Sequence, residues 1–234
     1  ELNVPEVRVP TAMRWIYEVK DVGSRADITN GHKLIHVYPN TLLAGLDILW
    51  RGKSVWVWDE SGGVPRMLLN ASIQHQRIDG AAELQYAFAD LVIVGPDRLK
   101  DNPFEQVSLQ GLAKAGAGVL VMAQSNVDMV CGYVVKKRAL ENGIEWQMDH
   151  PLLQGLSQDA LNALLDMRPH LPALQLPMDA PVLEIGHWRR ESPGRHPVPF
   201  DVLLATQSVG KGRLVFCQVP LSPWEKDPRT QILL

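Results

Sequence analysis

The chain of 234 residues lacks the features that mark several large classes of protein. Its basic residues are scattered and its net charge is −3, which argues against a groove that follows a nucleic-acid backbone. No apolar run approaches the roughly 20 residues of a membrane-spanning helix, so no membrane partner is expected. The two cysteines, Cys131 and Cys217, are too few for a disulfide framework and are wrongly spaced for a zinc site.

Familiar catalytic motifs are missing as well. The chain contains no G-x-S-x-G or G-x-C-x-G elbow, no P-loop and no G-x-G-x-x-G after a strand. Ser125 has no neighbouring glycine and is interpreted as a polar turn residue, and Glu184-x-x-His187 has no second histidine in metal-ligand spacing. We therefore expect no metal, no cofactor and no catalytic residue in this domain.

What the sequence does contain is an alternation of apolar runs and helical patterns. The predicted strands are residues 34–38, 54–58, 90–94 and 118–122. The predicted helices are residues 41–50, which Thr41 would cap, 81–88 and 105–115. Continuous apolar runs such as DLVIV and GVLVM are typical of strands that are buried on both faces of a parallel sheet. The pattern predicts an α/β fold of flavodoxin-like type, a three-layer, doubly wound and mainly parallel sheet.

The last quarter of the chain predicts a C-terminal β-hairpin. Residues 200–205 and 213–219 are apolar and flank the turn at Gly210-Lys211-Gly212. Asp227-Pro228 predicts the start of a helix, and the chain stops inside it. Because the chain also begins with Glu1, we expect it to be a fragment of a longer polypeptide.

The chain is predicted to be one domain with a lead-in. Residues 1–32 are interpreted as an extended lead-in or linker, with a short strand or a helical turn over 11–19, and residues 33–234 as the α/β domain. Within that domain, residues 157–167 predict a helix. The proline-rich stretch 169–199 is interpreted as a surface excursion.

A few residues are candidates for contacts with a ligand or another domain. Asp59 and Glu60 follow a predicted strand and are either paired acids, a cation-binding pair or solvated residues at the strand end. His150 is either a structural hydrogen-bonding residue or a general base. Most of the seven tryptophans should lie in the core, although tryptophan also stacks on sugars. The tryptophans that are candidates for carbohydrate or interdomain contacts are Trp56, Trp58, Trp146 and Trp224.

Three segments together resemble the class I glutamine amidotransferase-like superfamily. They are residues 90–96 with the following helix and 115–124, the segment HPLLQGLS that begins at His150, and VGKGRLV followed by Asp227-Pro228. The second of these looks like a segment of the sugar-related branches. The chain lacks the elbow cysteine and the His-x-Glu pair of active amidotransferases, so the resemblance implies a degenerate domain without glutaminase activity.

Such domains occur in multidomain glycoside hydrolases, including the trimerisation domain of some β-galactosidases. The resemblance therefore implies a non-catalytic accessory domain whose partners are the catalytic domain of the same polypeptide, a second copy in a homo-oligomer, or a carbohydrate. One alternative is a small ThuA-like enzyme that acts on a sugar derivative, with Asp59, Glu60 or His150 as acid or base. Another is an oligomerisation module with no link to carbohydrate.

Overall fold

The computed structural model describes residues 6–8, 11–24, 27–39, 45–86, 88–140, 143–165, 169–177, 179–189 and 200–220. The chain divides into two compact units, residues 1–44 and residues 45–234. The expected boundary between residues 32 and 33 falls inside a strand of the first unit. The helix cap at Thr41 and the helix that begins at Asp227-Pro228 lie outside the described residues.

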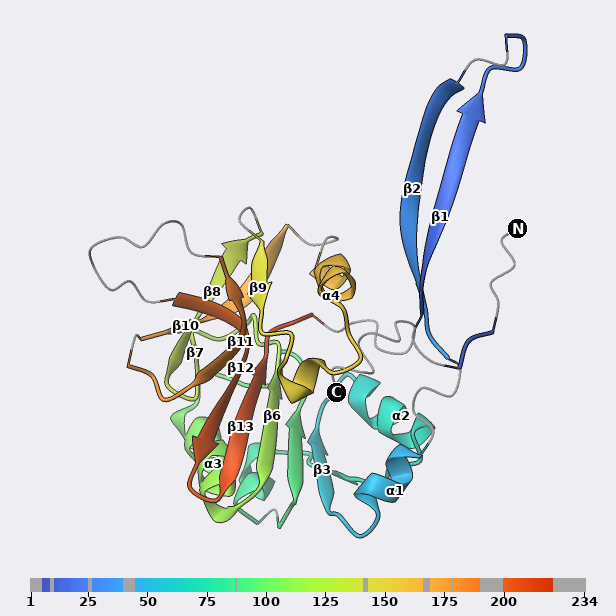
Figure 1. Cartoon of the computed structure of the whole chain (residues 1–234). Coiled ribbons are helices and arrows are strands. Elements are labelled where there is room, and N and C mark those ends of the chain that lie inside the picture. The colour runs from blue at the N-terminus through green and yellow to red at the C-terminus, as the bar shows by residue number, and fades with distance from the viewer. Residues whose placement is uncertain are drawn as a thin grey trace. The chain divides into compact units, whose positions relative to one another are not determined.

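The first unit contains a long two-stranded antiparallel ribbon (Figure 1). Strand β1 spans Thr11–Lys20 and β2 spans Asp27–Val37. Their register pairs Thr11 with Val37 at one end and Val19 with Thr29 near the other. The sequence-based choice for residues 11–19 between a strand and a helical turn is thus settled as a strand.

One face of this ribbon is mostly apolar. Alternation along β1 places Met13, Trp15, Tyr17 and Val19 on one side, and the register adds Ile35 from β2. The rings of Trp15 and Tyr17 lie 6.0 Å apart, and the tryptophan is 46% exposed. We call these five residues the apolar ribbon face.

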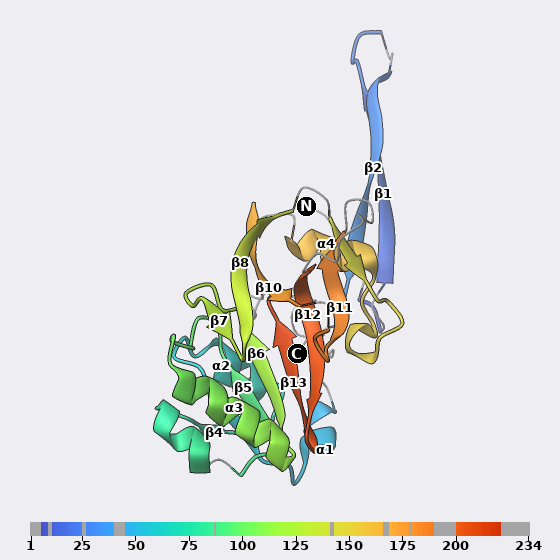
Figure 2. The same cartoon turned by 90° about the vertical axis from the view of Figure 1, so that its left-hand side faces the viewer.

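The second unit has α/β character around one mixed sheet (Figures 1 and 2). Its strand order is β4-β3-β5-β6-β13-β12-β10-β8-β7, and β11 joins β12 to β9. The first five strands of that order, β4, β3, β5, β6 and β13, pair in parallel. The pairs that follow, from β13-β12 to β8-β7, are antiparallel. The bounds of the strands are β3 Val55–Trp58, β4 Gln76–Arg77, β5 Leu91–Val94, β6 Gly118–Met122, β7 Met129–Val130, β8 Tyr133–Ala139, β9 Ile144–Trp146, β10 His170–Leu176, β11 Leu183–Trp188, β12 Phe200–Val209 and β13 Gly212–Cys217.

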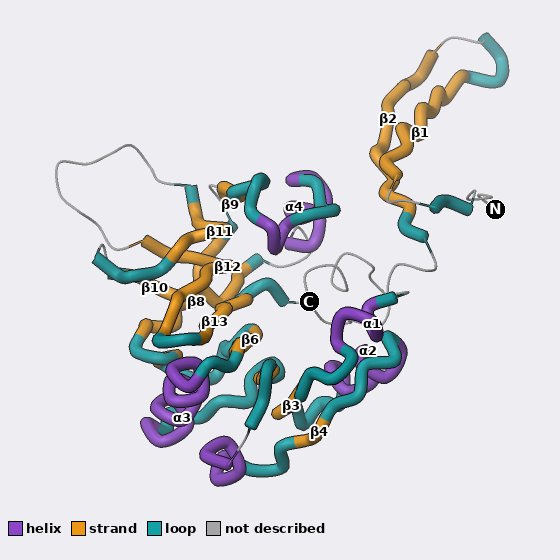
Figure 3. Tube along the Cα trace, turned by 60° about the horizontal axis from the view of Figure 1, so that its bottom comes forward, coloured by secondary structure: helices purple, strands orange, loops and turns teal. Residues whose placement is uncertain are grey.

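The helices of the second unit are short, apart from one (Figure 3). Their bounds are α1 Leu46–Trp50, α2 Gly63–Asn70, α3 Pro103–Ala115 and α4 Gln158–Leu165, with 3₁₀ turns at Ala81–Tyr86 and Pro151–Leu153. Helix α3 begins at Pro103, with Asn102 accepting a hydrogen bond from the Phe104 N–H, and it packs against β6, β12 and β13. No helix in the described ranges is long and apolar enough to cross a membrane.

The predicted mainly parallel, three-layer sheet is not confirmed, because half of the sheet is antiparallel. The difference arises in the region that was interpreted as a surface excursion. Two of its segments form β10 and β11 and pair with β12, whereas the predicted C-terminal hairpin is present as β12 and β13. Strand β12 is thus a junction: its first residues pair with β10, its middle with β11 and its last part with β13.

The core lies between the parallel strands and α3. Alternate residues of β5, β6 and β13 point to this helix, among them Val94, Val121 and Phe216, and all of these are buried. Leu109 and Ala113 of α3 complete the contact. This packing holds the carboxyl ends of the parallel strands together at one edge, where ligand sites of α/β folds usually lie.

Candidate functional site

Asp59 sits directly after β3 and is only 2% exposed. Its Oδ1 accepts hydrogen bonds from the N–H of Ser61 at 2.9 Å and from the Ser61 hydroxyl at 2.7 Å, and its Oδ2 accepts one from the Val64 N–H at 2.9 Å. Val64 lies in the first turn of α2, where backbone N–H groups have no partner within the helix. The carboxylate of Asp59 therefore joins β3 to α2.

Gln124 ties together the ends of β5, β6 and β13. This side chain is fully buried after β6. Its amide nitrogen donates to the carbonyl oxygens of Gly95 and Met122, and its carbonyl oxygen accepts from the Leu99 N–H. Its backbone N–H donates to the side chain of Gln218, which follows β13. All four of these bonds are between 2.8 and 3.0 Å long.

A second network of hydrogen bonds joins the loop after β5 to the loop after β6. Asp97 has a left-handed backbone (φ 51°), and its Oδ1 accepts hydrogen bonds from the N–H and the hydroxyl of Ser125. The side chain of Asn126 donates to the Asp97 carbonyl oxygen at 3.0 Å. Ser125 thus lies in the loop after β6, and its hydroxyl donates to the Asp97 carboxylate.

Arg98 covers Trp58 at the same edge. The guanidinium carbon lies 4.6 Å from the centre of the Trp58 ring, a cation–π geometry, and Nη1 is 2.9 Å from Oε1 of Glu60. Trp58 itself is 1% exposed and belongs to the core, whereas the Glu60 side chain is exposed. Asp59 and Glu60 therefore have different surroundings and do not form a paired acid site.

Three buried N–H donors near this edge have no partner among the described residues. They are Nε1 of Trp58, Nε of Arg98 and Nε2 of Gln218. Trp58 ends β3 and Gln218 follows β13, and β5 and β6 lie between these two strands, so these donors do not converge on one point. Among all the residues that the structure describes, there is no group of three or more His, Cys, Asp or Glu side chains that could hold a metal ion.

Two of the other candidate tryptophans, Trp56 and Trp146, have structural partners. Trp56 is partly buried against the core, and its Nε1 donates to the Ser54 hydroxyl at 3.0 Å. Trp146 of β9 donates to the side chain of Asn162 in α4 at 3.0 Å, so it joins the helix to the sheet. Trp224 lies outside the residues that the structure describes.

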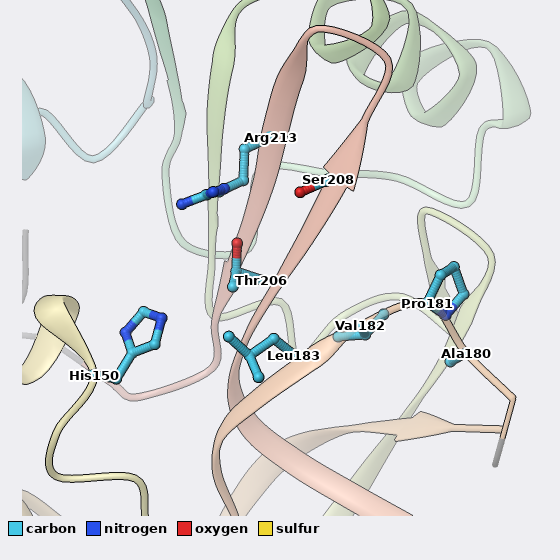
Figure 4. Close-up of a pocket in the computed structure, with 8 residues that line it drawn as sticks. All are labelled: His150, Ala180, Pro181, Val182, Leu183, Thr206, Ser208 and Arg213. Carbon is cyan, nitrogen blue, oxygen red and sulfur yellow. The ribbon is translucent and has the colours of Figure 1, made fainter.

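His150 lies in a pocket away from Asp59 and Glu60. The pocket has a volume of about 450 Å³ and is lined by His150, residues 180–183, Thr206, Ser208 and Arg213 (Figure 4). Thr206, Ser208 and Arg213 come from β12 and β13, and His150 precedes the 3₁₀ turn at Pro151. The apolar wall comes from the start of β11 and the loop before it. Its volume lies within the range of small-molecule sites, about 300–1,000 Å³.

The ring of His150 also has a structural role. Its Nδ1 accepts a hydrogen bond from the Leu152 N–H at 3.2 Å and caps the short 3₁₀ turn that begins at Pro151. A ring nitrogen that accepts a hydrogen bond carries no proton, so the remaining ring nitrogen, Nε2, is the donor in the neutral side chain. His150 is thus both a cap and a part of the pocket lining.

The two cysteines lie in the core. Cys131 and Cys217 are free thiols, and both are buried. Burial raises the pKa of each to about 12, because a thiolate is poorly solvated in an apolar setting. Neither thiol is a nucleophile at neutral pH.

Sequence reasoning missed most of the pocket. Of its lining residues only His150 was a candidate, because Thr206, Ser208 and Arg213 are ordinary strand and turn residues in sequence. A signal was present in the predicted hairpin: residues on the same side of two paired strands must lie together, and the register places Ser208 opposite Arg213.

No protein-family model matches the chain, and no curated protein matches its sequence. Among solved structures, a cytoplasmic protein from Salmonella typhimurium LT2 is similar over 95% of this chain and 90% of its own, with 12% identity and a TM-score of 0.46. A ThuA-like protein from Bacteroides uniformis is similar over 78% of this chain and 87% of its own, with 10% identity and a TM-score of 0.49.

A cold-adapted β-galactosidase from Rahnella is also similar, over 71% of this chain and 28% of its own, with 13% identity and a TM-score of 0.44. A ThuA-like protein and a β-galactosidase are therefore among the similar structures. These identities and scores do not show a family or an activity for this chain.

Proposed function

We propose that this chain is a non-catalytic accessory domain of a larger carbohydrate-active enzyme, in which it packs against the catalytic domain, shapes its cleft or builds an oligomer. The observation that carries the proposal is the hydrogen bonding at the carboxyl edge of the parallel strands. There, the side chains of Asp59, Asp97 and Gln124 each accept a hydrogen bond from a backbone N–H group, those of Val64, Ser125 and Leu99 in turn.

A catalytic acid or base must be able to reach a proton of the substrate. Both carboxylate oxygens of Asp59 accept hydrogen bonds from the α2 end and its preceding loop. Releasing them would leave buried N–H groups without partners, at a cost of about 1–3 kcal/mol for each. These side chains are therefore suited to holding the loops in place rather than to binding a substrate.

The apolar ribbon face supports a role in association. Two-stranded ribbons are marginally stable in water unless they pack against something, and clustered exposed apolar side chains mark interaction surfaces. Trp15, Tyr17 and Val19 are each more than 40% exposed. In this proposal the ribbon contacts the catalytic domain of the same polypeptide, and a second copy of the chain is the alternative partner.

The link to carbohydrate rests on the sequence resemblance, chiefly on the segment from His150 to Ser157. The alternative of a small enzyme that acts on a sugar derivative has one observation in its favour, namely that His150 lines a pocket. Asp59 and Glu60 do not line that pocket, so they would not share a reaction with His150.

The catalytic part of the proposal is tested by turnover of glutamine and of aryl glycosides. We expect no activity above the buffer blank for the natural chain. An Asp59→Ala variant should lose about 2 kcal/mol of unfolding free energy in urea, because it removes the acceptor at the start of α2, whereas Glu60→Gln should change stability little. Turnover that is abolished by Glu60→Gln or Cys131→Ala would contradict the proposal.

The association part is tested in the protein encoded by the full open reading frame. A photo-crosslinking amino acid is placed at Trp15 on the apolar ribbon face, or at Ile16 on the opposite face as the matched control. We expect crosslinks from position 15, and not from 16, to another domain of the same polypeptide. A reading frame that adds no further domain, or equal yields from both positions, would contradict the proposal.

A further inference from the structure

The pocket that contains His150 has a chemistry that the accessory role does not use. Strands β12 and β13 present three polar side chains on one side of the hairpin. Thr206 and Ser208 are two residues apart on β12 and therefore share a side, and Arg213 of β13 pairs with Ser208. Figure 4 shows the two hydroxyl oxygens on the same side of the hairpin as the Arg213 guanidinium, with His150 facing them from another part of the chain.

Arg213 brings a positive charge to the pocket, although the chain as a whole is acidic. Arg213 has no ion pair with any described carboxylate, and neither aspartate nor glutamate lines the pocket. Its backbone N–H donates to the Ala117 carbonyl oxygen, and its strand pairs with β6, so the position of the arginine in the fold is fixed. A guanidinium offers five N–H donors in a planar fork that matches a carboxylate or a phosphate.

The remaining lining adds hydrogen-bonding groups and an apolar wall. The Thr206 hydroxyl donates to the Leu214 carbonyl oxygen at 3.2 Å, so its oxygen remains able to accept a hydrogen bond. Nε2 of neutral His150 is a donor, as its Nδ1 bond requires. Val182 and Leu183 form an apolar surface beside these groups.

We propose that this pocket binds a small organic anion, with its carboxylate or phosphate group on Arg213 and its carbon skeleton against Val182 and Leu183. Ser208 and Thr206 then lie where they can bind hydroxyl groups of the same ligand. The proposal does not depend on the accessory role, because it concerns a different face of the domain and a different set of residues.

Isothermal titration calorimetry of the full chain tests this with four probes. Glucuronate and glucose differ in one carboxylate on the same ring, and a hexose phosphate and inorganic phosphate separate the phosphate group from the sugar. We expect glucuronate or the hexose phosphate to bind at least tenfold more tightly than glucose. Whichever of these two probes binds more tightly identifies the anionic group as a carboxylate or a phosphate. If the hexose phosphate binds more tightly than inorganic phosphate, the difference gives the contribution of the carbon skeleton.

The variants assign the site. Arg213→Gln should weaken binding of the anionic probe at least tenfold, and the matched surface variant Arg77→Gln on β4 should leave it unchanged. Leu183→Trp, which fills the pocket without changing its charge, should also weaken binding, and urea midpoints check that each variant is folded. Binding of glucose as tight as that of both glucuronate and the hexose phosphate, or unchanged binding by folded Arg213→Gln, would overturn the proposal.

Discussion

At the residue scale, the polar groups of this protein are arranged for cohesion. Asp59 and Gln124 each satisfy several backbone groups at the ends of strands. Such buried networks contribute only when every partner is present, because an unpaired buried group costs more than a formed bond contributes. The hydrogen bonds of Asp59 and Gln124 hold in place the loops that follow β3 and β5.

Asp201 is a buried carboxyl group in an environment that favours its protonated, neutral form. It lies on β12, with Oδ2 at 2.9 Å from Nε of Arg138. Burial raises the pKa of Asp201, and the nearby Arg138 and Lys136 only partly offset this. Since the folded state holds this proton more tightly than the unfolded state does, the contribution of the group to stability is present at low pH and is lost as pH rises through the raised pKa.

We therefore expect the Asp201→Asn variant to become more stable relative to the natural chain as the pH rises above the ordinary pKa of an aspartate. The quantity compared is the free energy of unfolding of the two chains. Urea unfolding between pH 3 and pH 7 measures this. Asp90 is the control of opposite sign, because hydrogen bonds from the Ser54 N–H and from Lys53 lower its pKa. The Asp90→Asn variant should be less stable than the natural chain at neutral pH, and that deficit should vanish on acidification. A difference for Asp201→Asn that does not vary with pH would refute this assignment.

At the scale of elements, the turn between β12 and β13 is fitted closely to the end of α3. A Cβ atom on Gly212 would collide with the carbonyl oxygens of Ala113 and Ala117, and Gly210 has a left-handed backbone (φ 61°). By contrast, Gly111 lies within α3, where an added Cβ meets nothing within 4 Å.

This contrast gives a matched pair of glycine substitutions. Gly212→Ala should destabilise the fold by about 2 kcal/mol or more, because strand or helix must shift to make room. Gly111→Ala should stabilise it by roughly 0.5–1 kcal/mol, because alanine is the better helix former. Thermal and urea unfolding of the two variants checks both signs, and a loss of stability for both would contradict an open space around Gly111.

The sequence predicted the parallel half of the sheet better than the antiparallel half. Continuous apolar runs gave β5 and β6 directly, and the predicted helix over residues 105–115 matches α3 within two residues. Strands β10 and β11 were missed because prolines surround them and their neighbours in the sheet are distant in sequence. Helix α2 was missed because Gly62 and Gly63 at its start are poor helix formers, although Asp59 accepts a hydrogen bond from the Val64 N–H in its first turn.

The candidate site shows the same limit. Pattern analysis located the loop at Asp59 and the segment at His150, but it had no means of finding that one is a cap and the other lines a pocket. Arg213 and Thr206 join His150 only through the pairing of β12 with β13 and the return of the chain through β11. That return belongs to the stretch whose strands the sequence did not reveal.

At the scale of the whole molecule, the two units differ in how they are stabilised. The buried hydrophobic side chains of the described residues begin at Val55, so all of them belong to the second unit. The ribbon of the first unit has cross-strand pairs but no buried apolar core of its own among the described residues.

We therefore expect a truncated chain of residues 45–234 to fold cooperatively, with a melting temperature within a few degrees of that of the full chain. Circular dichroism in the far and near ultraviolet would measure the transition and the tertiary packing. Loss of the cooperative transition on truncation would contradict the division into units, and a fragment of residues 1–44 should by itself show no such transition.

The position of the two cysteines has a practical consequence. Since both native thiols are buried and protonated, a cysteine introduced on the surface would react with maleimide dyes far faster than either of them. One dye on the tip of the ribbon and another beside α3 would then report, by energy transfer, the distance between the two units in solution and any change in that distance when a partner arrives.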